Sequence, residues 1–405
     1  MSSLIFRKGL DLQHAVAGML AENYHSQIVS SIKDNDFTFR QGRLTIQLAR
    51  EFGFCYGVDR AVDYAYQARQ RFPNQRVFLT GEIIHNPHVN DKLRAMGIRF
   101  LSDPVQNVEA RTAIDTLEAS DVVILPAFGV TVTTLQRLER RGCTLVDTTC
   151  GSVLNVWKNV RRYAEGGYVS VIHGKVWHEE TQATASQAAV YGGKYLVVYD
   201  RQESGRVCDY IRHGGDAKAF LASFANAVSE DFDPDRDLGR VGLANQTTML
   251  MSESLEIAGL FKQAMVDRWG QADLDAHYQS FDTICSATQD RQDAVVTLLR
   301  DRPVDLMLVI GGYNSSNTAN LARICAATRP TFHVADPSCL VSPTEIRHRP
   351  IGGKAEIATT GWLPAAGPLN VGLTSGASTP DNLVGEAVTR LAGFCADTSP
   401  EPPDP

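Results

Sequence analysis

Three cysteines at the starts of predicted helices constrain this chain more than any other feature. Cys55, Cys150 and Cys285 each follow an extended, partly apolar run and precede a helical pattern. They lie far apart in the sequence and no Cys-x-x-Cys pair occurs, which excludes the compact zinc and thioredoxin motifs. We therefore interpret these cysteines as ligands that three separate substructures bring to one shared centre.

The composition is that of an ordinary globular protein. The 405 residues predict two or three domains, and the hydrophobic content of 43% and charged content of 21% are typical of soluble chains. No apolar run approaches the roughly 20 residues that a membrane helix needs, so we expect no membrane partner. The net charge of −7 and the absence of a basic block argue against a nucleic-acid partner.

The N-terminal sequence indicates the compartment. Its first residues lack the apolar core of a secretory signal, and four acidic residues argue against an organelle transit peptide: Asp11, Glu22, Asp34 and Asp36. We therefore expect a reducing compartment, favouring a bacterial cytoplasm over a plastid stroma. In such a compartment, eight cysteines are expected to be thiols or metal ligands rather than disulfides.

Short apolar runs alternate with helical patterns from residue 44 onward. The runs are rich in Val, Ile and Leu and are bounded by Gly, Asp or Pro, which is typical of parallel strands buried on both faces. The predicted strands are residues 44–48, 76–84, 121–126, 168–172, 195–199, 240–243, 305–310, 331–334 and 370–373. This alternation predicts an α/β fold.

A weak internal repeat follows the cysteines and suggests the domain boundaries. Apolar residues fall at the same helical offsets after Cys55 and after Cys150, and a shifted version follows Cys285. We therefore predict three α/β domains at residues 44–149, 150–283 and 284–394, with Cys150 and Cys285 starting the second and third. Residues 1–43 are expected to be a loosely docked extension, and residues 395–405 a disordered tail.

The cysteine contexts favour metal binding. Each of the three lies where a helix begins, and a helix N-terminus favours the thiolate, which is the ligating form. Three thiolates around an iron–sulfur cluster would leave one iron without a protein ligand, free to act as a Lewis acid. The other five cysteines are interpreted as small buried hydrophobic residues: Cys143, Cys208, Cys325, Cys339 and Cys395.

Two stretches have the character of anion-binding loops. Gly311-Gly-Tyr-Asn-Ser-Ser-Asn-Thr and Thr374-Ser-Gly-Ala-Ser-Thr-Pro-Asp each follow a predicted strand and open a helix. Backbone N–H groups, together with side chains such as those of Ser315, Ser316 and Asn317, would suit phosphate oxygens. Simple helix capping, with Ser378 or Thr379 as the cap of the second helix, is the alternative.

Histidine and acidic residues follow other predicted strands. His85 lies in Glu82-Ile-Ile-His-Asn-Pro-His, and His178 in Trp177-His-Glu-Glu-Thr. A carboxylate such as Glu180 beside a bound oxygen would be a natural proton donor. Thr247, in Ala244-Asn-Gln-Thr-Thr, could relay a proton or fix that carboxylate.

Together these stretches resemble the IspH/LytB family of 4-hydroxy-3-methylbut-2-enyl diphosphate reductases. The matching pieces occur in family order and span about residues 44–392. They are Gly53-Phe-Cys-Tyr-Gly-Val-Asp-Arg-Ala-Val, Ile84-His-Asn-Pro, Asp147-Thr-Thr-Cys, His178-Glu-Glu-Thr, Asn245-Gln-Thr-Thr, Ile284-Cys-Ser-Ala-Thr-Gln-Asp-Arg-Gln, Asn314-Ser-Ser-Asn and Ser375-Gly-Ala-Ser-Thr-Pro-Asp.

The resemblance implies a trefoil of three α/β domains, with mostly parallel sheets, around one [4Fe–4S] cluster with an open iron. Cys55, Cys150 and Cys285 match the family's three ligands. The implied reaction is the last step of the methylerythritol phosphate pathway. The allylic diphosphate loses its hydroxyl with two electrons and two protons, giving isopentenyl and dimethylallyl diphosphates.

The resemblance also implies the roles of the polar residues. His85 and His178 match histidines that line the substrate site, Glu180 matches the acid that delivers the proton, and Thr247 matches its supporting hydroxyl. The implied diphosphate-binding set is Ser315, Ser316, Asn317 and Ser378. Phe128 departs from the pattern, because it stands where many family members have histidine. The sequence looks like the cyanobacterial and plastid branch, which implies ferredoxin as the electron donor.

Three alternatives stay open at this point. Another three-cysteine cluster enzyme, such as quinolinate synthase, acts on dicarboxylates, so the Asn-Ser-Ser-Asn stretch speaks against it. An iron–sulfur sensor or electron carrier would have no use for the His178-Glu-Glu-Thr stretch. A cluster-free binder of sugar phosphates or nucleotides would purify without iron.

Overall fold

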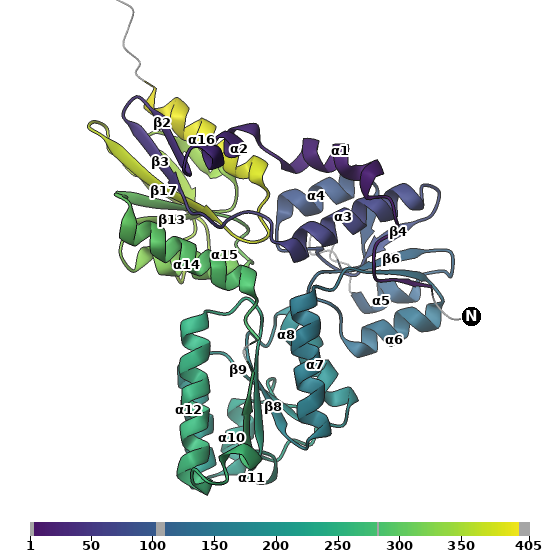
Figure 1. Cartoon of the computed structure of the whole chain (residues 1–405). Helices are drawn as coiled ribbons and strands as arrows, with labels where there is room; N and C mark the ends of the chain where they lie inside the picture. The colour runs from purple at the N-terminus through teal and green to yellow at the C-terminus, as the bar shows by residue number, and fades with distance from the viewer. Residues whose placement is uncertain (1–3, 103–109, 282, 397–405) are drawn as a thin grey trace, which may run out of the picture. The chain divides into compact units, whose positions relative to one another are not determined.

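The computed structural model describes residues 4–102, 110–281 and 283–396 (Figure 1). The chain forms two compact units, each built from segments that are separated in the sequence. Unit 1 comprises Met1–Gln13, Arg60–Ile84 and Asn90–Cys285, and unit 2 comprises His14–Asp59, His85–Val89 and Ser286–Pro405. The sheets are mostly parallel and covered by helices, so the predicted α/β class is confirmed.

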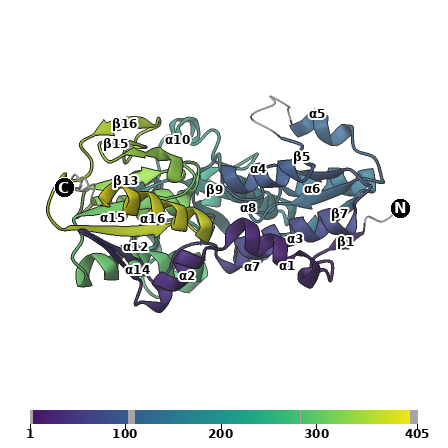
Figure 2. The same cartoon turned by 90° about the horizontal axis from the view of Figure 1, so that it is seen from above.

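The first sheet of unit 1 has five parallel strands in the order β1-β7-β6-β4-β5. Its strands are β1 (Ile5–Phe6), β4 (Val77–Leu79), β5 (Ile98–Phe100), β6 (Val122–Leu125) and β7 (Thr144–Asp147). Its helices are α3 (Tyr56–Arg71), α4 (Pro87–Ala95), α5 (Ala110–Asp115) and α6 (Val132–Arg141). Figures 1 and 2 show α3 and α4 on one face of the sheet and α5 and α6 on the other.

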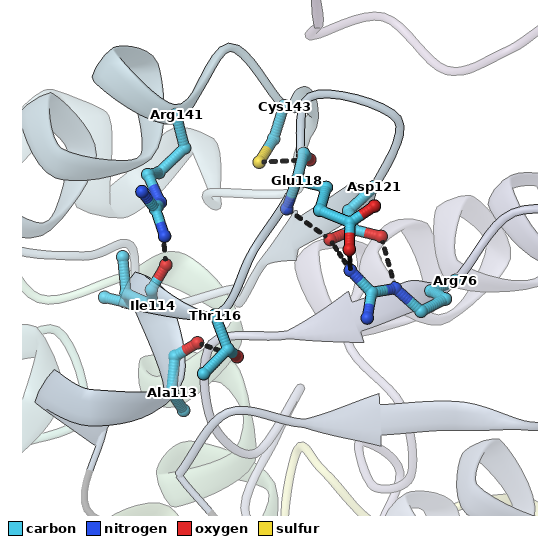
Figure 3. A network of polar contacts seen from close by, with 8 residues as sticks. All are labelled: Arg76, Ala113, Ile114, Thr116, Glu118, Asp121, Arg141 and Cys143. Carbon is cyan, nitrogen blue, oxygen red and sulfur yellow. Dashed lines mark hydrogen bonds and ion pairs between the residues drawn. The ribbon is translucent and has the colours of Figure 1, made fainter.

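A polar network ties β4 and β6 together at their amino ends (Figure 3). Arg76 donates two hydrogen bonds of 2.7 Å to the buried carboxylate of Asp121, which also accepts from the backbone N–H of Glu118. The Cys143 thiol donates to the Glu118 carbonyl at 3.3 Å. Burial, with the negative charge of Asp121, raises the pKa of this thiol. Cys143 is therefore a structural residue, as predicted.

The second sheet of unit 1 has four parallel strands in the order β11-β10-β8-β9. Its strands are β8 (Val169–His173), β9 (Tyr195–Val198), β10 (Val241–Asn245) and β11 (Tyr278–Ser280). Helices α7 (Gly151–Glu165) and α8 (Glu179–Val190) cover one face, and α9 (Arg201–His213) and α12 (Met251–Trp269) cover the other. The short helices are α10 (Ala217–Ser223), α11 (Pro234–Asp237) and α13 (Leu274–His277).

Unit 2 contains a five-stranded sheet in the order β13-β12-β17-β3-β2, parallel except for the antiparallel β2. Its strands are β2 (Thr38–Gln41), β3 (Leu44–Leu48), β12 (Leu306–Ile310), β13 (Thr331–Val334) and β17 (Leu369–Ser375). Helices α2 (Gln27–Asp34) and α16 (Asp381–Cys395) cover one face, while α14 (Ser286–Asp301) and α15 (Ser316–Ala326) cover the other. A small antiparallel sheet, β14 (Leu340–Ser342), β15 (Glu345–His348) and β16 (Ile357–Thr360), follows the 3₁₀ turn Pro337–Cys339.

The prediction of a loosely docked N-terminal extension is wrong for the described residues 4–43. Strand β1 pairs with β7, and β2 pairs with β3. Helix α1 (Gln13–Tyr24) buries Val16 and Tyr24, and Val29 and Ile32 of α2 lie in the core of unit 2. The physical reason is that Val29 and Ile32, three residues apart, lie on one face of α2, and this apolar face packs into the core of unit 2.

Most predicted strand boundaries differ from the structure by one or two residues, and one differs by more. The strand predicted over residues 76–84 ends at Leu79, and residues 80–86 form the loop that carries His85. Cys395, predicted as part of the tail, is the last residue of α16 and is buried, while residues 397–405 lie outside the described part. No helix within the described ranges is long and apolar enough to cross a bilayer.

Candidate functional site

Burial separates the cysteines into the same two groups that the sequence predicted. Cys55, Cys150 and Cys285 are half-buried, whereas the other five are buried. Burial raises the pKa of the Cys208 and Cys325 thiols to about 12, which keeps them protonated and makes them poor metal ligands. The accessible thiols are therefore those at the starts of helices.

Unit 1 holds two of these cysteines at the carboxyl ends of its sheets. Cys150 is the N-cap residue of α7, and its backbone N–H donates to the Ala127 carbonyl at 2.9 Å, in the loop after β6. Cys285 directly precedes α14, and its N–H donates to the Thr247 carbonyl at 3.3 Å, in the loop after β10. Each cysteine is thus fixed to a neighbouring strand-end loop.

The carboxylate of Glu180 is buried and hydrogen-bonded through both of its oxygens. It lies in the first turn of α8 with only 2% of its surface exposed. Oε1 accepts from the backbone N–H of Thr247 at 2.5 Å, and Oε2 accepts from the Thr247 hydroxyl at 3.0 Å. Because the Thr247 carbonyl binds the N–H of Cys285, one residue connects this carboxylate to a candidate metal ligand.

His178 and Phe128 lie beside this carboxylate. His178 is the N-cap residue of α8, and its Nδ1 accepts from the Glu180 N–H at 3.2 Å. Phe128, which directly follows Ala127, meets the His178 ring edge-on with ring centroids 5.9 Å apart. Phe128 therefore supplies an apolar wall for His178. Unit 1 brings Cys150, Cys285, His178, Glu180 and Thr247 into one continuous set of contacts.

Gln246 joins the two loops that carry the polar groups of unit 1. Its side-chain oxygen accepts from the N–H of Lys175 at 3.1 Å and from the Thr181 hydroxyl at 3.2 Å, and its own N–H donates to the His173 carbonyl. The loop before α8 and the loop after β10 are consequently cross-linked. The position of Glu180 against Thr247 therefore depends on Gln246, a residue that the sequence did not single out for this role.

Unit 2 holds Cys55 against the second predicted anion-binding stretch. The N–H of Cys55 donates to the Ala377 carbonyl at 3.2 Å, and the N–H of Ala377 donates to Oδ1 of Asn317 at 3.0 Å. The two stretches approach so closely that a Cβ at Gly376 would lie 1.9 Å from the Thr318 hydroxyl. Glycine is therefore required there by the close approach of the two loops.

His85 also contacts the two predicted anion-binding stretches of unit 2. The Ser378 hydroxyl donates to the His85 carbonyl at 3.2 Å, and Nδ2 of Asn314 lies 3.4 Å from His85 Nδ1. A Cβ at Gly312 would come within 2.7 Å of the same carbonyl, so this glycine admits the histidine backbone. His85, the Asn314–Asn317 stretch, Ser378 and Cys55 thus form a second set of contacts.

The amide of Asn317 combines burial with an unused hydrogen-bond donor. Asn317 is 3% exposed, its Oδ1 accepts from Ala377, and its Nδ2 is buried without a hydrogen-bond partner among the described residues. Such an unpartnered donor costs stability unless a ligand supplies the acceptor.

Ser315 is the N-cap of α15 and accepts from the N–H of Thr318, so it has a capping role at the first stretch. Ser316 is buried in the first turn. At the second stretch, the expected cap Ser378 or Thr379 is wrong, because Pro380 is the N-cap of α16 and makes no side-chain cap hydrogen bond.

His333, on β13, forms a hydrogen bond to the first residue of the first predicted anion-binding stretch. Its Nε2 lies 3.0 Å from the Gly311 carbonyl, so this nitrogen must carry the proton. Burial lowers the pKa of His333 to about 4. Sequence reasoning did not select this residue, because a lone histidine in a strand has no distinguishing pattern.

A pH dependence of stability follows from this buried histidine. Since the unfolded chain takes up the proton near pH 6.5 and the folded chain only near pH 4, the free energy of unfolding should fall over this range by up to about 3 kcal/mol as the pH is lowered. His333→Gln should lose this share of the pH dependence, because the amide donates without titrating. Denaturant unfolding at several pH values measures it, with the exposed His14→Gln as control. If the free energy of unfolding depended on pH equally in the wild type and in His333→Gln, His333 would not be the source of this pH dependence.

The fold and the two sets of contacts define an α/β protein with accessible cysteines at helix starts and two contacting loops at strand ends. The model of the LytB protein family matches residues 46–392, and the chain belongs to this family. A 4-hydroxy-3-methylbut-2-enyl diphosphate reductase of Gloeobacter violaceus is 48% identical over 387 residues, covering 95% of this chain and 91% of the relative. The reductase of that name from a Synechococcus species is 48% identical over 386 residues, covering 95% and 92%.

Solved structures agree with the sequence relatives. A structure of (E)-4-hydroxy-3-methyl-but-2-enyl diphosphate reductase, the terminal enzyme of the non-mevalonate pathway, matches with a TM-score of 0.53 and 26% identity, covering 86% of this chain and 99% of that one. The Plasmodium falciparum E-1-hydroxy-2-methyl-but-2-enyl-4-diphosphate reductase matches with a TM-score of 0.58 and 20% identity, covering 85% and 86%, and shows the fold alone. The family match does not favour the quinolinate synthase, sensor or cluster-free alternatives.

Proposed function

We propose that this protein reduces 4-hydroxy-3-methylbut-2-enyl diphosphate to isopentenyl and dimethylallyl diphosphates, at the end of the non-mevalonate route to isoprenoids. The observation that carries the proposal is the carboxylate of Glu180, held by Thr247 on a peptide that also binds Cys285. The curated relatives bear the name of this reductase over almost the whole chain. Turnover of that diphosphate under anaerobic conditions tests the proposal.

The donor set fits an iron–sulfur cluster. Cys55, Cys150 and Cys285 are the accessible thiols, and each lies at or just before the start of a helix, where a thiolate is stabilised. A [4Fe–4S] cluster bound by these three residues would supply the electrons and a Lewis-acidic iron without a protein ligand. The five buried cysteines have no part in it.

The anion-binding residues of unit 2 would hold the diphosphate. The unpartnered amide N–H of Asn317 and the first-turn N–H groups of α15 suit phosphate oxygens. The hydroxyls of Ser315, Ser316 and Ser378, together with His85, complete the proposed binding set. Holding the anion fixes where the short allylic chain and its hydroxyl can reach.

Glu180 would donate the proton that turns the leaving hydroxyl into water. Its burial excludes bulk solvent, and the two hydrogen bonds from Thr247 fix the orientation of the carboxyl group. His178 and Phe128 would line the substrate beside it. The overall reaction consumes two electrons and two protons and releases one water.

The proposal also includes the electron donor and the cellular compartment. Ferredoxin is the proposed electron donor, since the relatives are cyanobacterial and such cells supply reduced ferredoxin. A bacterial cytoplasm is the proposed location, in keeping with the organisms of these relatives.

Changing Asn317 to aspartate should weaken diphosphate binding. Asn317→Asp keeps an acceptor for the Ala377 N–H but replaces the buried amide donor with a negative oxygen that repels phosphate. We expect KM for the diphosphate to rise at least about tenfold, because an unmade charge-assisted hydrogen bond costs on the order of 1.5–3 kcal/mol. Steady-state kinetics measure this, with the exposed Asn226→Asp as control. An unchanged KM would remove Asn317 from the binding set.

A further inference from the structure

A buried arginine without an acidic partner lies against the loop that carries Cys55. Arg291, on α14, is 4% exposed. Its Nη2 donates to the Gly53 carbonyl at 2.8 Å, and its Nη1 donates to the Ala287 carbonyl at 2.7 Å. Its Nε is buried with no hydrogen-bond partner in the described part of the chain. Within the described ranges, the guanidinium therefore donates to neutral carbonyls only.

Gly53, which this arginine binds, is fixed on both sides. Its N–H donates to the Ser375 hydroxyl at 3.0 Å, and its φ of +79° lies in the left-handed region. L side chains rarely adopt this conformation, and a Cβ here would also crowd a carboxylate oxygen of Asp381, so glycine is favoured at this position. Because Gly53 stands two residues before Cys55, Arg291 and Ser375 together set the direction in which the chain enters that cysteine.

A second arginine makes the same kind of contact before Cys150. Arg60, on α3, donates from Nη2 to the carbonyls of Thr148 and Thr149, the two residues that precede Cys150. Its Nε is also buried without a partner among the described residues. Arg60 thus comes from the helix after Cys55 and holds the peptide before Cys150. Arg291 comes from the helix after Cys285 and holds the peptide before Cys55.

For the buried Arg291 these contacts are costly unless negative charge is added nearby, whereas Arg60 is half-buried and also lies over the ring of Tyr64. A buried cation loses its hydration, and neutral carbonyls recover only part of that free energy. Among the residues that the structure describes, neither Arg60 nor Arg291 forms an ion pair with a carboxylate. The charge that is missing is what cysteine thiolates and a metal centre of net negative charge would provide.

We infer that Arg291 and Arg60 are positioning residues of the proposed iron–sulfur centre, which orient the peptides entering Cys55 and Cys150 and offset the negative charge of the thiolates. The inference rests on the proposed function, because it needs the cluster to be bound by these cysteines. One-electron reduction adds negative charge to the centre, so a fixed positive charge nearby favours the reduced form. Removing that charge should make the centre harder to reduce.

The test is a redox titration of anaerobically reconstituted protein, followed by EPR, with iron measured per chain. In Arg291→Gln, the equilibrium between oxidised and reduced protein should shift about tenfold toward the oxidised form, equal to about 59 mV for a one-electron couple. Arg60→Gln should shift it in the same direction. Arg300→Gln is the matched control, because Arg300 lies on the same helix, is exposed and pairs with Asp301.

Arg291→Lys separates charge from hydrogen-bond geometry and serves if Arg291→Gln does not fold. It keeps the positive charge, so its potential should stay near that of the wild type, but one ammonium cannot reproduce the guanidinium contacts. Iron should therefore leave this variant several-fold faster in the presence of a chelator.

Two results would overturn the inference, and they differ. In the first, the wild type binds iron, but Arg291→Gln and Arg60→Gln have the same potential and the same rate of iron loss as Arg300→Gln. This result refutes the role of the arginines and leaves the proposed function intact. Wild-type protein that binds no iron refutes both.

Discussion

Replacing Glu180 by glutamine should lower the turnover of the allylic diphosphate by at least about 100-fold, which is the range expected when a general acid is removed. Glutamine has nearly the same shape, and its side-chain oxygen can still accept from Thr247, so the local fold should survive. What is lost is the proton that can be transferred to the leaving hydroxyl. Anaerobic assays with a chemical reductant, at saturating substrate, measure the effect on kcat.

Glu179→Gln is the control for this substitution. Glu179 is the preceding residue on α8 and is exposed, whereas Glu180 is buried. Glu179→Gln should keep most of the activity, and both variants should retain the wild-type iron content. Full activity in Glu180→Gln would sink its assignment as the proton donor, while loss of iron would mean that the carboxylate supports the fold of the site instead.

The second large effect is expected from the cysteines. Changing Cys55, Cys150 or Cys285 singly to alanine should reduce the iron retained after a chelator wash by at least about tenfold, because losing a ligand costs more than losing a supporting contact, which itself costs 10–100-fold. Activity should be lost with the iron. Iron per chain and the visible absorption of anaerobically purified protein provide the measurement.

Cys143→Ala is the matched control for the ligand variants. Its thiol is buried and donates to the Glu118 carbonyl, so its loss should destabilise the fold by about 1–3 kcal/mol while the iron content stays unchanged. If Cys143→Ala lost iron as readily as Cys150→Ala, the division of the cysteines by burial would be wrong.

The buried strands and the accessible cysteines could be predicted from local sequence alone. Strands β3 and β13 have the predicted bounds, because a short Val/Ile/Leu run bounded by turn residues is a strong local signal. The cysteines were selected by their position before a helical pattern, a signal that depends on a few neighbouring residues. In the structure these three cysteines are half-buried and the other five are buried, which is the same division.

Pairing between distant segments could not be predicted. Strand β1 has two residues and β7 has four, and each gains its stability from its neighbour in the sheet rather than from its own pattern. Strand β2 is recognisable only once β3 is known to need an antiparallel partner.

Tertiary contacts also determine the supporting residues of the site. Gln246, His333 and Arg291 act through hydrogen bonds to backbone carbonyls or N–H groups that are remote in sequence. The amide of Asn317, by contrast, lies in a stretch that the sequence already marked for anion binding.

The most direct test of the central claim is product formation by anaerobically purified protein, reduced and incubated with 4-hydroxy-3-methylbut-2-enyl diphosphate. The account predicts that isopentenyl and dimethylallyl diphosphates both appear, together with one equivalent of water, and that Cys150→Ala forms neither. Iron-bound, reduced protein that leaves the diphosphate unchanged would contradict it.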